Sequence, residues 1–417
     1  MEQQVRKKQA YEIKPVGTFH IRFSHDILVR IFALLALFSL TAILMIYAAA
    51  GLHTGLAGRQ GASDYVKARV EAVLSSDTSP DNAYPERRTG EQQLRIRILE
   101  GSYSGRQMEI TNYVNVLHDI EARQGMTIVV QLTHQSDGSL SASVYNYDRS
   151  GVLILFGVCV LALLCIAGGL KGVQSLFGIL FTVLCVVFIL LPFVLKGAPP
   201  IGIALLVVVL ATAVHFILLD GIGRKTVPAL ISTVAGALFS AGAASLVGAI
   251  ASLNGFHMQE AEALLLQSAH GQIPIHGLLV AGILISAHGA VMDVAITIAS
   301  AVDEFRRESP MHSDTDRFRF GMRVGRDAMG TMVNTLVLAY VGSSLNTLLL
   351  LYSYGISFAQ LINTDLIGVE LLEGLAGSLG IILTVPLVAF LSAFLAGRLH
   401  TAPTTLPKKP EPVKQPQ

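Results

Sequence analysis

One acidic residue lies in the middle of a long apolar stretch of this chain. Asp293 is flanked on both sides by the predominantly aliphatic residues of the segment 275–302. A charged side chain at the centre of a lipid bilayer costs about 2.5–3.5 kcal/mol on insertion scales. An acid at such a position usually binds a proton or an ion, or holds a structural partner. Asp293 is therefore the first candidate for chemistry in this sequence.

A polar face surrounds Asp293 if the segment is helical. Ser286, Gly289, Thr297 and Ser300 stand four or seven residues away from it, and residues at these spacings share one side of a helix. The other sides carry Leu, Ile, Val and Ala. We expect this polar, small-residue face to look into a helix bundle rather than at lipid.

The next apolar segment repeats the pattern. Asp327, Gly330, Thr331 and Asn334 lie on it at helical spacing. A basic loop joins the two segments. Counted from that loop at about 1.5 Å per residue, Asp293 lies at a depth of about 15 Å and Asn334 at about 10 Å. The two polar groups are therefore expected at similar depth.

These depths predict a set of partners for Asp293, namely Asn334, Thr331 and Thr297. Low dielectric favours the neutral form of a carboxyl group, so Asp293 is expected to take up a proton from water at neutral pH, as a proton-coupled carrier requires. Asp327 is a further ion- or proton-binding candidate. The alternative is structural, because Asp293 could hydrogen-bond Asn334 and only hold two helices together.

Secondary candidates belong to the same polar face or to a short amphipathic stretch, 358–373, that precedes the last apolar segment. They are Ser286, Ser300, Asn363, Asp365 and Glu370.

Other chemistry is not indicated. His215 and His288 lie in apolar segments, where a histidine is more often a satisfied core residue than a ligand. His257 and Glu260 have the spacing of two metal ligands, but a solvated loop is the better interpretation. The sequence contains no Ser/His/Asp set, no H-E-x-x-H motif and no glycine-rich phosphate loop. We therefore predict no catalytic residues, no metal site and no cofactor.

The composition is that of a membrane protein. Of 417 residues, 52% are hydrophobic and 14% are charged, whereas a soluble domain carries about 25% charged residues. The net charge of +1 gives no basic field that would attract nucleic acid. The three cysteines lie in apolar segments and follow no metal-ligand spacing. The expected partners are the lipid bilayer, a proton or cation, and an unidentified substrate or protein.

Eight apolar segments are long enough to cross a bilayer, which takes about 20 residues. Basic residues cluster before the first segment, after the last one and on alternate connections between them. Because basic loops stay on the cytoplasmic side, both termini are predicted to be cytoplasmic. The segments are residues 31–50, 152–169, 173–195, 201–219, 227–253, 275–302, 329–352 and 375–395.

The polar insertion between the first two segments has the pattern of β-structure. Apolar and polar residues alternate with period two in four places, which is typical of half-buried strands. Asp137-Gly138 separates the last two of these places and predicts a hairpin turn, whereas 75–88 is interpreted as a loop rich in Pro, Asp and Ser. The four places are residues 66–72, 94–98, 128–132 and 140–144.

The predicted fold class is an α-helical polytopic membrane protein of about eight transmembrane helices. A small extracytoplasmic β-rich domain of about five strands, a barrel or a sandwich, lies between the first and second helices. The predicted parts are a cytoplasmic segment 1–30, an uncleaved transmembrane anchor 31–50, the β-rich domain 51–150, a seven-helix membrane domain 151–398 and a disordered cytoplasmic tail 399–417.

Three blocks in the membrane half resemble the YibE/F-like family of bacterial multi-pass membrane proteins. The family tends to have a Glu near Asp365 and a second acid near Glu370, so the shorter Asp365 would fall short of a site that needs the longer side chain. The resemblance implies a protein of the bacterial cytoplasmic membrane, and it implies no substrate. The blocks are 289–296 (GAVMDVAI), 325–332 (GRDAMGTM) with 334–336 (NTL) and 339–344 (AYVGSS), and 377–381 (GSLGI) with Pro386.

These features favour a transporter or exporter. Asp293 would be the carboxyl group that responds to a proton or an ion, and the β-rich domain would recognise or gate a substrate. The alternative is a non-transporting scaffold or sensor, in which the β-rich domain binds a partner and the helices only anchor and assemble.

Overall fold

The computed structural model describes residues 25–49, 63–81, 84–115, 119–134, 139–253, 264 and 275–395. The chain divides into two compact units. One consists of Met1–Ala42, Val208–Ala261 and Ile275–Gln417, and the other of Ile43–Val207 and Glu262–Pro274.

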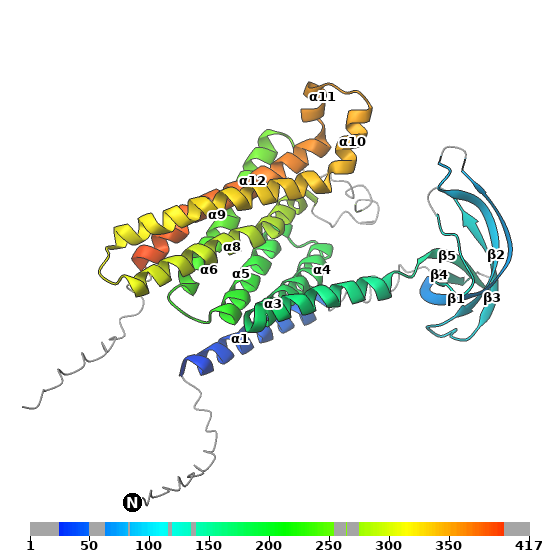
Figure 1. Ribbon diagram of the computed structural model, residues 1–417, viewed down its shortest axis with the longest axis horizontal. Coiled ribbons are helices and arrows are strands. Elements are labelled where there is room, and N and C mark those ends of the chain that lie inside the picture. Colours follow the sequence, from blue (N-terminus) through cyan, green and yellow to red (C-terminus); the bar gives the residue numbers. More distant parts are fainter. Residues whose placement is uncertain are drawn as a thin grey trace, which may run out of the picture. The chain divides into compact units, whose positions relative to one another are not determined.

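The β-domain is one antiparallel sheet of five strands in the described residues, in the order β3-β2-β1-β4-β5 (Figure 1). The two edge strands, β3 and β5, also contact each other, so the sheet curls into a partly open barrel, as in the five-stranded OB-fold. The strands are β1 (Ser63–Pro80), β2 (Arg88–Ile98), β3 (Gln107–Val114), β4 (Thr127–His134) and β5 (Leu140–Tyr147).

The interior of the barrel is formed by the apolar residues of the period-two patterns. Ala68, Leu94, Ile96, Ile128 and Val130 are fully buried, while their sequence neighbours face outward. The prediction of a β-rich domain with these strands is therefore confirmed for β1, β2, β4 and β5. The predicted Asp137-Gly138 turn lies outside the described residues.

Two details of the predicted β-domain were wrong. Residues 75–80 are not a loop, because β1 continues to Pro80 and pairs there with the first residues of β2. The pairing has two irregularities in register, one between Val70 and Ala72 and one between Val73 and Ser75. These irregularities interrupt the period-two alternation, so the pattern does not reveal the end of β1. The fifth strand, β3, was not located, because the polar Asn112 occupies one of its buried inward positions.

Six helices in the described part of the chain are long and apolar enough to cross a membrane, or seven if the pair α9 and α10, bent by 56°, forms one span. The helices are α1 (His25–Ala49), α3 (Ser150–Cys185), η1 (Val186–Leu190), α4 (Leu191–Leu195), α5 (Pro200–Leu219), α6 (Thr226–Ile250), η2 (Ile275–Gly277), α8 (Leu278–Glu308), α9 (Asp314–Ser343), α10 (Leu345–Ser353), α11 (Phe358–Ile362), α12 (Asp365–Phe390) and η3 (Leu391–Leu395).

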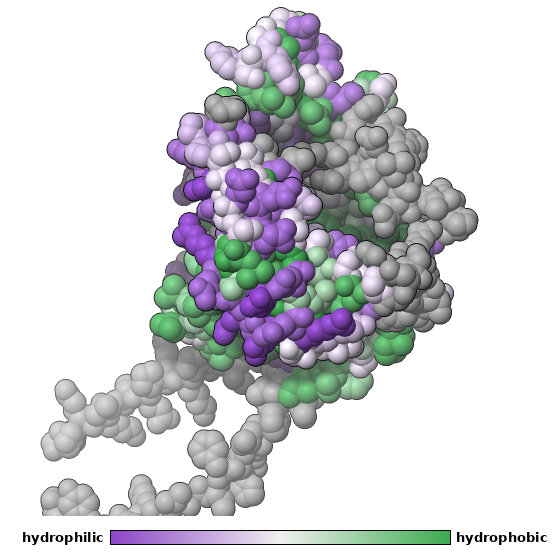
Figure 2. Space-filling view, turned by 90° about the vertical axis from the view of Figure 1, so that its right-hand side faces the viewer, coloured by the Kyte–Doolittle hydropathy of each residue, from purple (hydrophilic) through white to green (hydrophobic). Residues whose placement is uncertain are grey.

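Exposed apolar surface on these helices identifies a membrane protein. Val152, Leu153, Ile154 and Leu155 on α3 are between 64% and 74% exposed. A soluble protein rarely leaves so large a contiguous apolar patch in water, whereas acyl chains cover it at no cost. Large hydrophilic areas lie beside separate hydrophobic patches on the face that Figure 2 shows.

The run Ser150–Leu195 counts as a single candidate span of 46 residues, although the sequence predicted two. A straight helix of this length would extend about 69 Å, more than twice the hydrocarbon core of a bilayer. The run is broken at Gly169, which has a positive φ of 55°. A Cβ atom at Gly172 would collide with the carbonyl oxygen of Leu164, so the chain bends sharply between the two halves.

The helices α6, α8, α9 and α12 pack together around one apolar core. The helices α6 and α12 approach each other closely, because a Cβ atom on Gly236 would overlap Thr384 and a Cβ atom on Gly380 would overlap Ser240. Small residues at these crossings let the two backbones come close.

Candidate functional site

Asp293 lies on the exposed side of α8. Ser286, Gly289 and Thr297 are exposed with it, and a Cβ atom on Gly289 would meet no atom within 4 Å. The aliphatic residues of α8, such as Val291, form the opposite side and bury it in the core. The prediction that the polar face looks into the bundle is therefore wrong, because the aliphatic side of α8 is the one buried in the core.

The predicted partners of Asp293 also lie on an exposed side, that of α9. Thr331, Asn334 and Asp327 are all exposed, and the hydroxyl of Thr331 donates to the carbonyl oxygen of Ala328 at 2.9 Å. Across the described part of the chain, no hydrogen bond joins Asp293 to Thr297, Thr331 or Asn334. The structure therefore does not join Asp293 to its predicted partners. The alternative, a hydrogen bond between Asp293 and Asn334 that holds two helices together, is not formed either.

A different polar cluster joins the three helices α8, α9 and α12. The hydroxyl of Tyr340 donates to the Oγ of Ser286 at 2.5 Å. Glu370 and Glu373 stand three residues apart on α12, on one face of that helix. A cavity of about 110 Å³ beside this cluster is lined by Tyr340, Glu370 and otherwise mainly apolar residues, including Leu371.

This cluster contains two predicted residues, Ser286 and Glu370, and two that were not predicted, Tyr340 and Glu373. The spacing of Glu370 and Glu373 could have revealed the second acid, because residues three apart share a helix face. Tyr340 gave no such signal, since tyrosine is common at the ends of membrane helices.

The remaining predicted candidates lie elsewhere. Asn363 is exposed and donates to the carbonyl oxygen of Ala359 at 2.7 Å, and Asp365 is exposed in the first turn of α12. The stretch 358–373 is not one element, because α11 ends at Ile362 and α12 begins at Asp365. His257 and Glu260 lie outside the described residues.

Charged residues gather at the ends of α5, α6 and α8. Lys225 forms an ion pair with Asp220, and its Nζ lies 3.4 Å from the Oγ of Ser300. Arg30 of α1 donates to the carbonyl oxygen of Asp220. Ser300, predicted as part of the Asp293 face, thus belongs to the end of the bundle.

The C-terminal end of α8 is hydrogen-bonded to η3, the segment that follows α12. Arg306 donates from its Nη2 to the carbonyl oxygens of Ser392 at 2.7 Å and Ala393 at 2.8 Å. Both acceptors lie in η3, where wider π-type turns leave backbone carbonyls available.

His288 does not have the surroundings of an ordinary core histidine. It is 6% exposed, and its Nδ1 is buried without a hydrogen-bond partner in the described part of the chain. The other histidine of the apolar segments, His215 on α5, is half-buried. The interpretation of His288 as a satisfied core residue is therefore wrong.

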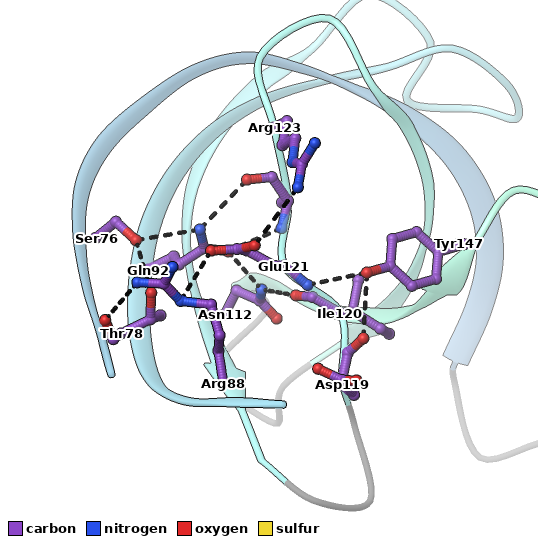
Figure 3. Close-up of polar contacts among 11 residues, drawn as sticks. Ser76, Thr78, Arg88, Gln92, Asn112, Asp119, Ile120, Glu121, Arg123 and Tyr147 are labelled. Carbon is purple, nitrogen blue, oxygen red and sulfur yellow. Dashed lines mark hydrogen bonds and ion pairs between the residues drawn. The ribbon is translucent and has the colours of Figure 1, made fainter. Parts of the chain in front are cut away.

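The β-domain contains a buried polar network (Figure 3). The side chain of Gln92 accepts from the backbone N–H of Ala122 at 2.9 Å and from Asn112 at 3.1 Å, and Asn112 also donates to the carbonyl oxygen of Ile120 at 2.6 Å. The hydroxyl of Tyr147 accepts from the backbone of Glu121 at 3.1 Å. These bonds hold the segment 119–123 against the barrel, so the network is structural.

A metal site is not apparent in the described residues, where no group of three or more His, Cys, Asp and Glu side chains could hold an ion.

Comparisons with known proteins match most of the chain to one family. A family model described as YibE/F-like protein matches residues 156–398. A second model, described as YibE/F family N-terminal domain, matches residues 63–147, which correspond to the β-domain. The same comparisons found no similar curated protein and no similar solved structure.

Proposed function

The chain belongs to the YibE/F-like family, and because this membership brings no activity with it, we propose a function from the residues of the chain itself: a membrane transporter coupled to protons or ions. The substrate is a solute that the family name does not identify. Asp293 is the proposed carboxyl group that responds to the coupling ion.

The observation that carries this proposal is the number of ionisable side chains within apolar helices. Asp293 and His288 lie in α8, His215 in α5, and Glu370 and Glu373 in α12, all three of which are candidate spans. Ionisable residues in such helices are rare and costly, and they generally mark an ion or proton pathway. An anchor that only holds a domain at the membrane needs none of them.

The position of Asp293 supports a functional role over a structural one. Its carboxyl group is exposed, and no hydrogen bond to another described residue accounts for it. A carboxylate that faced only acyl chains would be unfavourable by about 2.5–3.5 kcal/mol. The proposal therefore requires that water reach this face of α8.

The proposed topology has eight spans, with Ser150–Leu195 counted as two and α9 with α10 as one. The break at Gly169 and the excessive length of that run support the first count. With basic loops on the cytoplasmic side, both termini are cytoplasmic and the β-domain lies outside, in the cytoplasmic membrane of a bacterium.

A second candidate function is that of a scaffold or sensor, and the surface of the β-domain favours it. Tyr65, Tyr113 and Tyr145 are 56%, 61% and 49% exposed, and the rings of Tyr65 and Tyr145 pack edge to face at 4.7 Å. Exposed tyrosines are enriched in protein-binding surfaces. A transporter can use the same surface to recognise its substrate.

Flux in proteoliposomes tests the transporter proposal. Vesicles that hold the full chain and a pH-sensitive dye are given a pH gradient, and the low-molecular-mass fraction of a bacterial extract is added as the source of substrate. We expect this fraction to speed the collapse of the gradient in wild-type vesicles. Asp293→Asn removes the ionisable group at nearly constant volume and should reduce the rate to that of empty liposomes.

Glu304→Gln is the matched control, because Glu304 is an exposed acid three turns along the same side of α8. This variant should transport as wild type does. Wild-type vesicles that behave as empty liposomes under gradients of either direction would contradict the transporter proposal. Equal loss in Asp293→Asn and Glu304→Gln would contradict the role of Asp293.

A further inference from the structure

The cavity beside Tyr340 lies between α9, α10 and α12. Its volume is about 110 Å³, and the bend of 56° between α9 and α10 lets both helices line it together with α12. An engineered apolar cavity of about 150 Å³ holds a benzene molecule, so this one has room for a group of similar size. It opens at the surface of the bundle, where the lining residues Val341 and Leu375 are 46% and 64% exposed.

Tyr340 is held in the wall of this cavity from several sides. Its hydroxyl donates to the Oγ of Ser286 at 2.5 Å, and Gly374 of α12 lies against its ring, because a Cβ atom there would be 3.7 Å from the Cδ2 of Tyr340. Ser344, which also lines the cavity, is 5% exposed and donates to the carbonyl oxygen of Tyr340 at 3.0 Å. The hydroxyl groups of the wall therefore have partners within the protein.

Glu370 is different, because its charge has no counterpart in the described part of the chain. No Lys, Arg or His is among the residues that line the cavity, and no hydrogen bond or ion pair joins the half-buried Glu370 to another described residue. Glu370 lies five residues from the first residue of α12, or about 7.5 Å along the helix, so a solute can reach it from that end. An ionisable side chain in a membrane span pairs with another charge or marks the path of an ion or substrate. We therefore expect the missing positive charge on a ligand.

A second cavity, between α6 and α12, has no such charge. Its volume is about 380 Å³, and its lining consists of aliphatic residues and glycine, which suits the acyl chain of a lipid. The two cavities share Leu371 and Leu375, so they lie on either side of one ridge of α12. Glu370 lines only the smaller cavity, which is therefore the one that can select a ligand by its charge.

We propose that the cavity at Glu370 binds organic cations, molecules that carry an ammonium group on a small apolar body. The inference rests on the proposed transport function, of which it names the substrate class. The apolar body fills the cavity, and the long, flexible side chain of Glu370 brings its carboxylate to the ammonium group. The ring of Tyr340 in the wall adds a further attraction for a cation. A mainly apolar wall with few polar groups is usual for small-molecule sites.

Charge decides which molecules this site accepts. An anion is repelled by the carboxylate of Glu370, and the repulsion is strong where the dielectric constant is low. A neutral molecule of the same shape fills the cavity but leaves the carboxylate without a partner. An inorganic cation has no apolar body to bury, and it loses its hydration in an apolar cavity. The expected order of affinity is organic cation, neutral analogue, anion.

Equilibrium dialysis on the full chain in nanodiscs of zwitterionic lipid tests this order. The three radiolabelled probes share a phenyl ring: phenyltrimethylammonium is a cation, N,N-dimethylaniline is uncharged at neutral pH, and benzenesulfonate is an anion. Empty nanodiscs give the binding to lipid alone. We expect the cation to bind about 10- to 100-fold more tightly than the neutral probe, the range that a contact with a charged group supplies, and the anion not to bind.

Two variants locate the binding site. Glu370→Gln removes the charge at nearly constant volume and should lower the affinity for the cation about 10- to 100-fold, to that of the neutral probe. Val341→Phe fills the cavity from a partly exposed position and should abolish binding of both probes. Asp365→Asn is the matched control, because it removes an exposed acid from the same end of α12 that does not line the cavity. This variant should bind as wild type does.

Three outcomes of the dialysis would overturn the proposal. They are equal affinity of the wild type for the three probes, equal loss of cation binding in Glu370→Gln and Asp365→Asn, and undiminished binding in Val341→Phe. The comparison of probes uses only the wild-type protein, so a folding defect of a variant does not affect it.

Flux separates this inference from the transporter proposal. Phenyltrimethylammonium has a permanent charge, so it does not cross a bilayer as a neutral amine. Under a pH gradient it should accumulate in wild-type proteoliposomes and not in those with Glu370→Gln. A wild-type protein that binds the cation through Glu370 but shows no flux with the cation or with the extract would refute the transporter and leave the binding site. Flux with the extract but no binding of the cation would refute this site and leave the transporter in place.

Discussion

Asp148 is held between the β-domain and the helix that follows it. Its Oδ1 accepts from the hydroxyl of Ser150 at 2.5 Å and from the backbone N–H of Ser150 at 3.1 Å. Its Oδ2 lies 3.2 Å from the Nζ of Lys67 on β1. The hydrogen bond from the Ser150 side chain, followed by the Lys67 contact, lowers the pKa of Asp148 below its ordinary value.

A lowered pKa in the folded state predicts how stability depends on pH. The ionised Asp148 stabilises the fold at neutral pH, and this contribution is lost as the pH falls through its lowered pKa. Asp148→Asn should therefore melt at a lower temperature than wild type at about pH 7, and the difference between the two melting temperatures should shrink as the pH falls below the ordinary pKa range of aspartate. Asp64→Asn, at an exposed position of β1, is the control. A difference in melting temperature that stays constant down to the lowest pH would contradict the account.

The sequence reveals which residue types stand in an apolar segment, but it does not reveal which side chains surround them in the fold. Asp293 stands out from the sequence because an acid is rare among aliphatic neighbours, and its location in a long apolar helix is confirmed. The environment of His288 could not be predicted, since an unpartnered Nδ1 depends on side chains of α5, α6 and α12 that are distant in sequence.

At the scale of the elements, the helices were predictable and their orientations were not. Hydrophobic periodicity predicts a buried face when the other face is in water. Between lipid and a helix bundle this contrast disappears, because acyl chains are as apolar as leucine. Both the polar side of α8 and its aliphatic side were therefore possible inner faces, and the structure buries the aliphatic side around Val291 and Ile298.

On α6 the spacing of small residues marks the inner face more reliably than hydrophobic periodicity does. Gly236, Ser240, Ala244 and Gly248 recur every four residues on α6, and all are buried. Gly236 lies where α6 crosses α12, so its lack of a side chain sets the distance between two backbones. This pattern follows from steric size and is independent of the solvent around the helix.

Gly236→Ala tests this packing. The added methyl group would overlap Thr384 and approach Val291 at 2.8 Å, so we expect a loss of about 1–3 kcal/mol in stability. Gly242→Ala is the control on the same helix, because a Cβ atom there meets nothing within 4 Å. It should be neutral or stabilising by about 0.5–1 kcal/mol. Unfolding in mixed detergent micelles measures both, and equal stability of the two variants would contradict the close crossing.

At the scale of the whole molecule, two features were read correctly from the sequence: a β-rich domain and a set of apolar helices. Period-two alternation fixes the strands locally, so most of the β-domain could be predicted. The closure of the barrel could not, because the segment 119–123 is held by Gln92 and Asn112, whose polarity argues against burial in any local pattern.

The arrangement of ionisable groups also belongs to this scale. Tyr340, Ser286 and Glu370 come from three separate helices, so no motif along the chain could join them. Folding places this cluster, the exposed Asp293 and the buried His288 on three different parts of one bundle. A coupled transporter can divide the binding of substrate and proton among such sites.

The central claim is that water reaches the Asp293 face of α8. Cysteine labelling in proteoliposomes tests it most directly, with Gly289→Cys and Thr297→Cys introduced after the three native cysteines are replaced by alanine. Leu246→Cys on α6, 64% exposed on an apolar surface, is the lipid-facing control. We predict that a charged, water-soluble thiosulfonate modifies positions 289 and 297 but not 246. Modification of all three positions only by a membrane-soluble maleimide would place the Asp293 face in lipid and contradict the account.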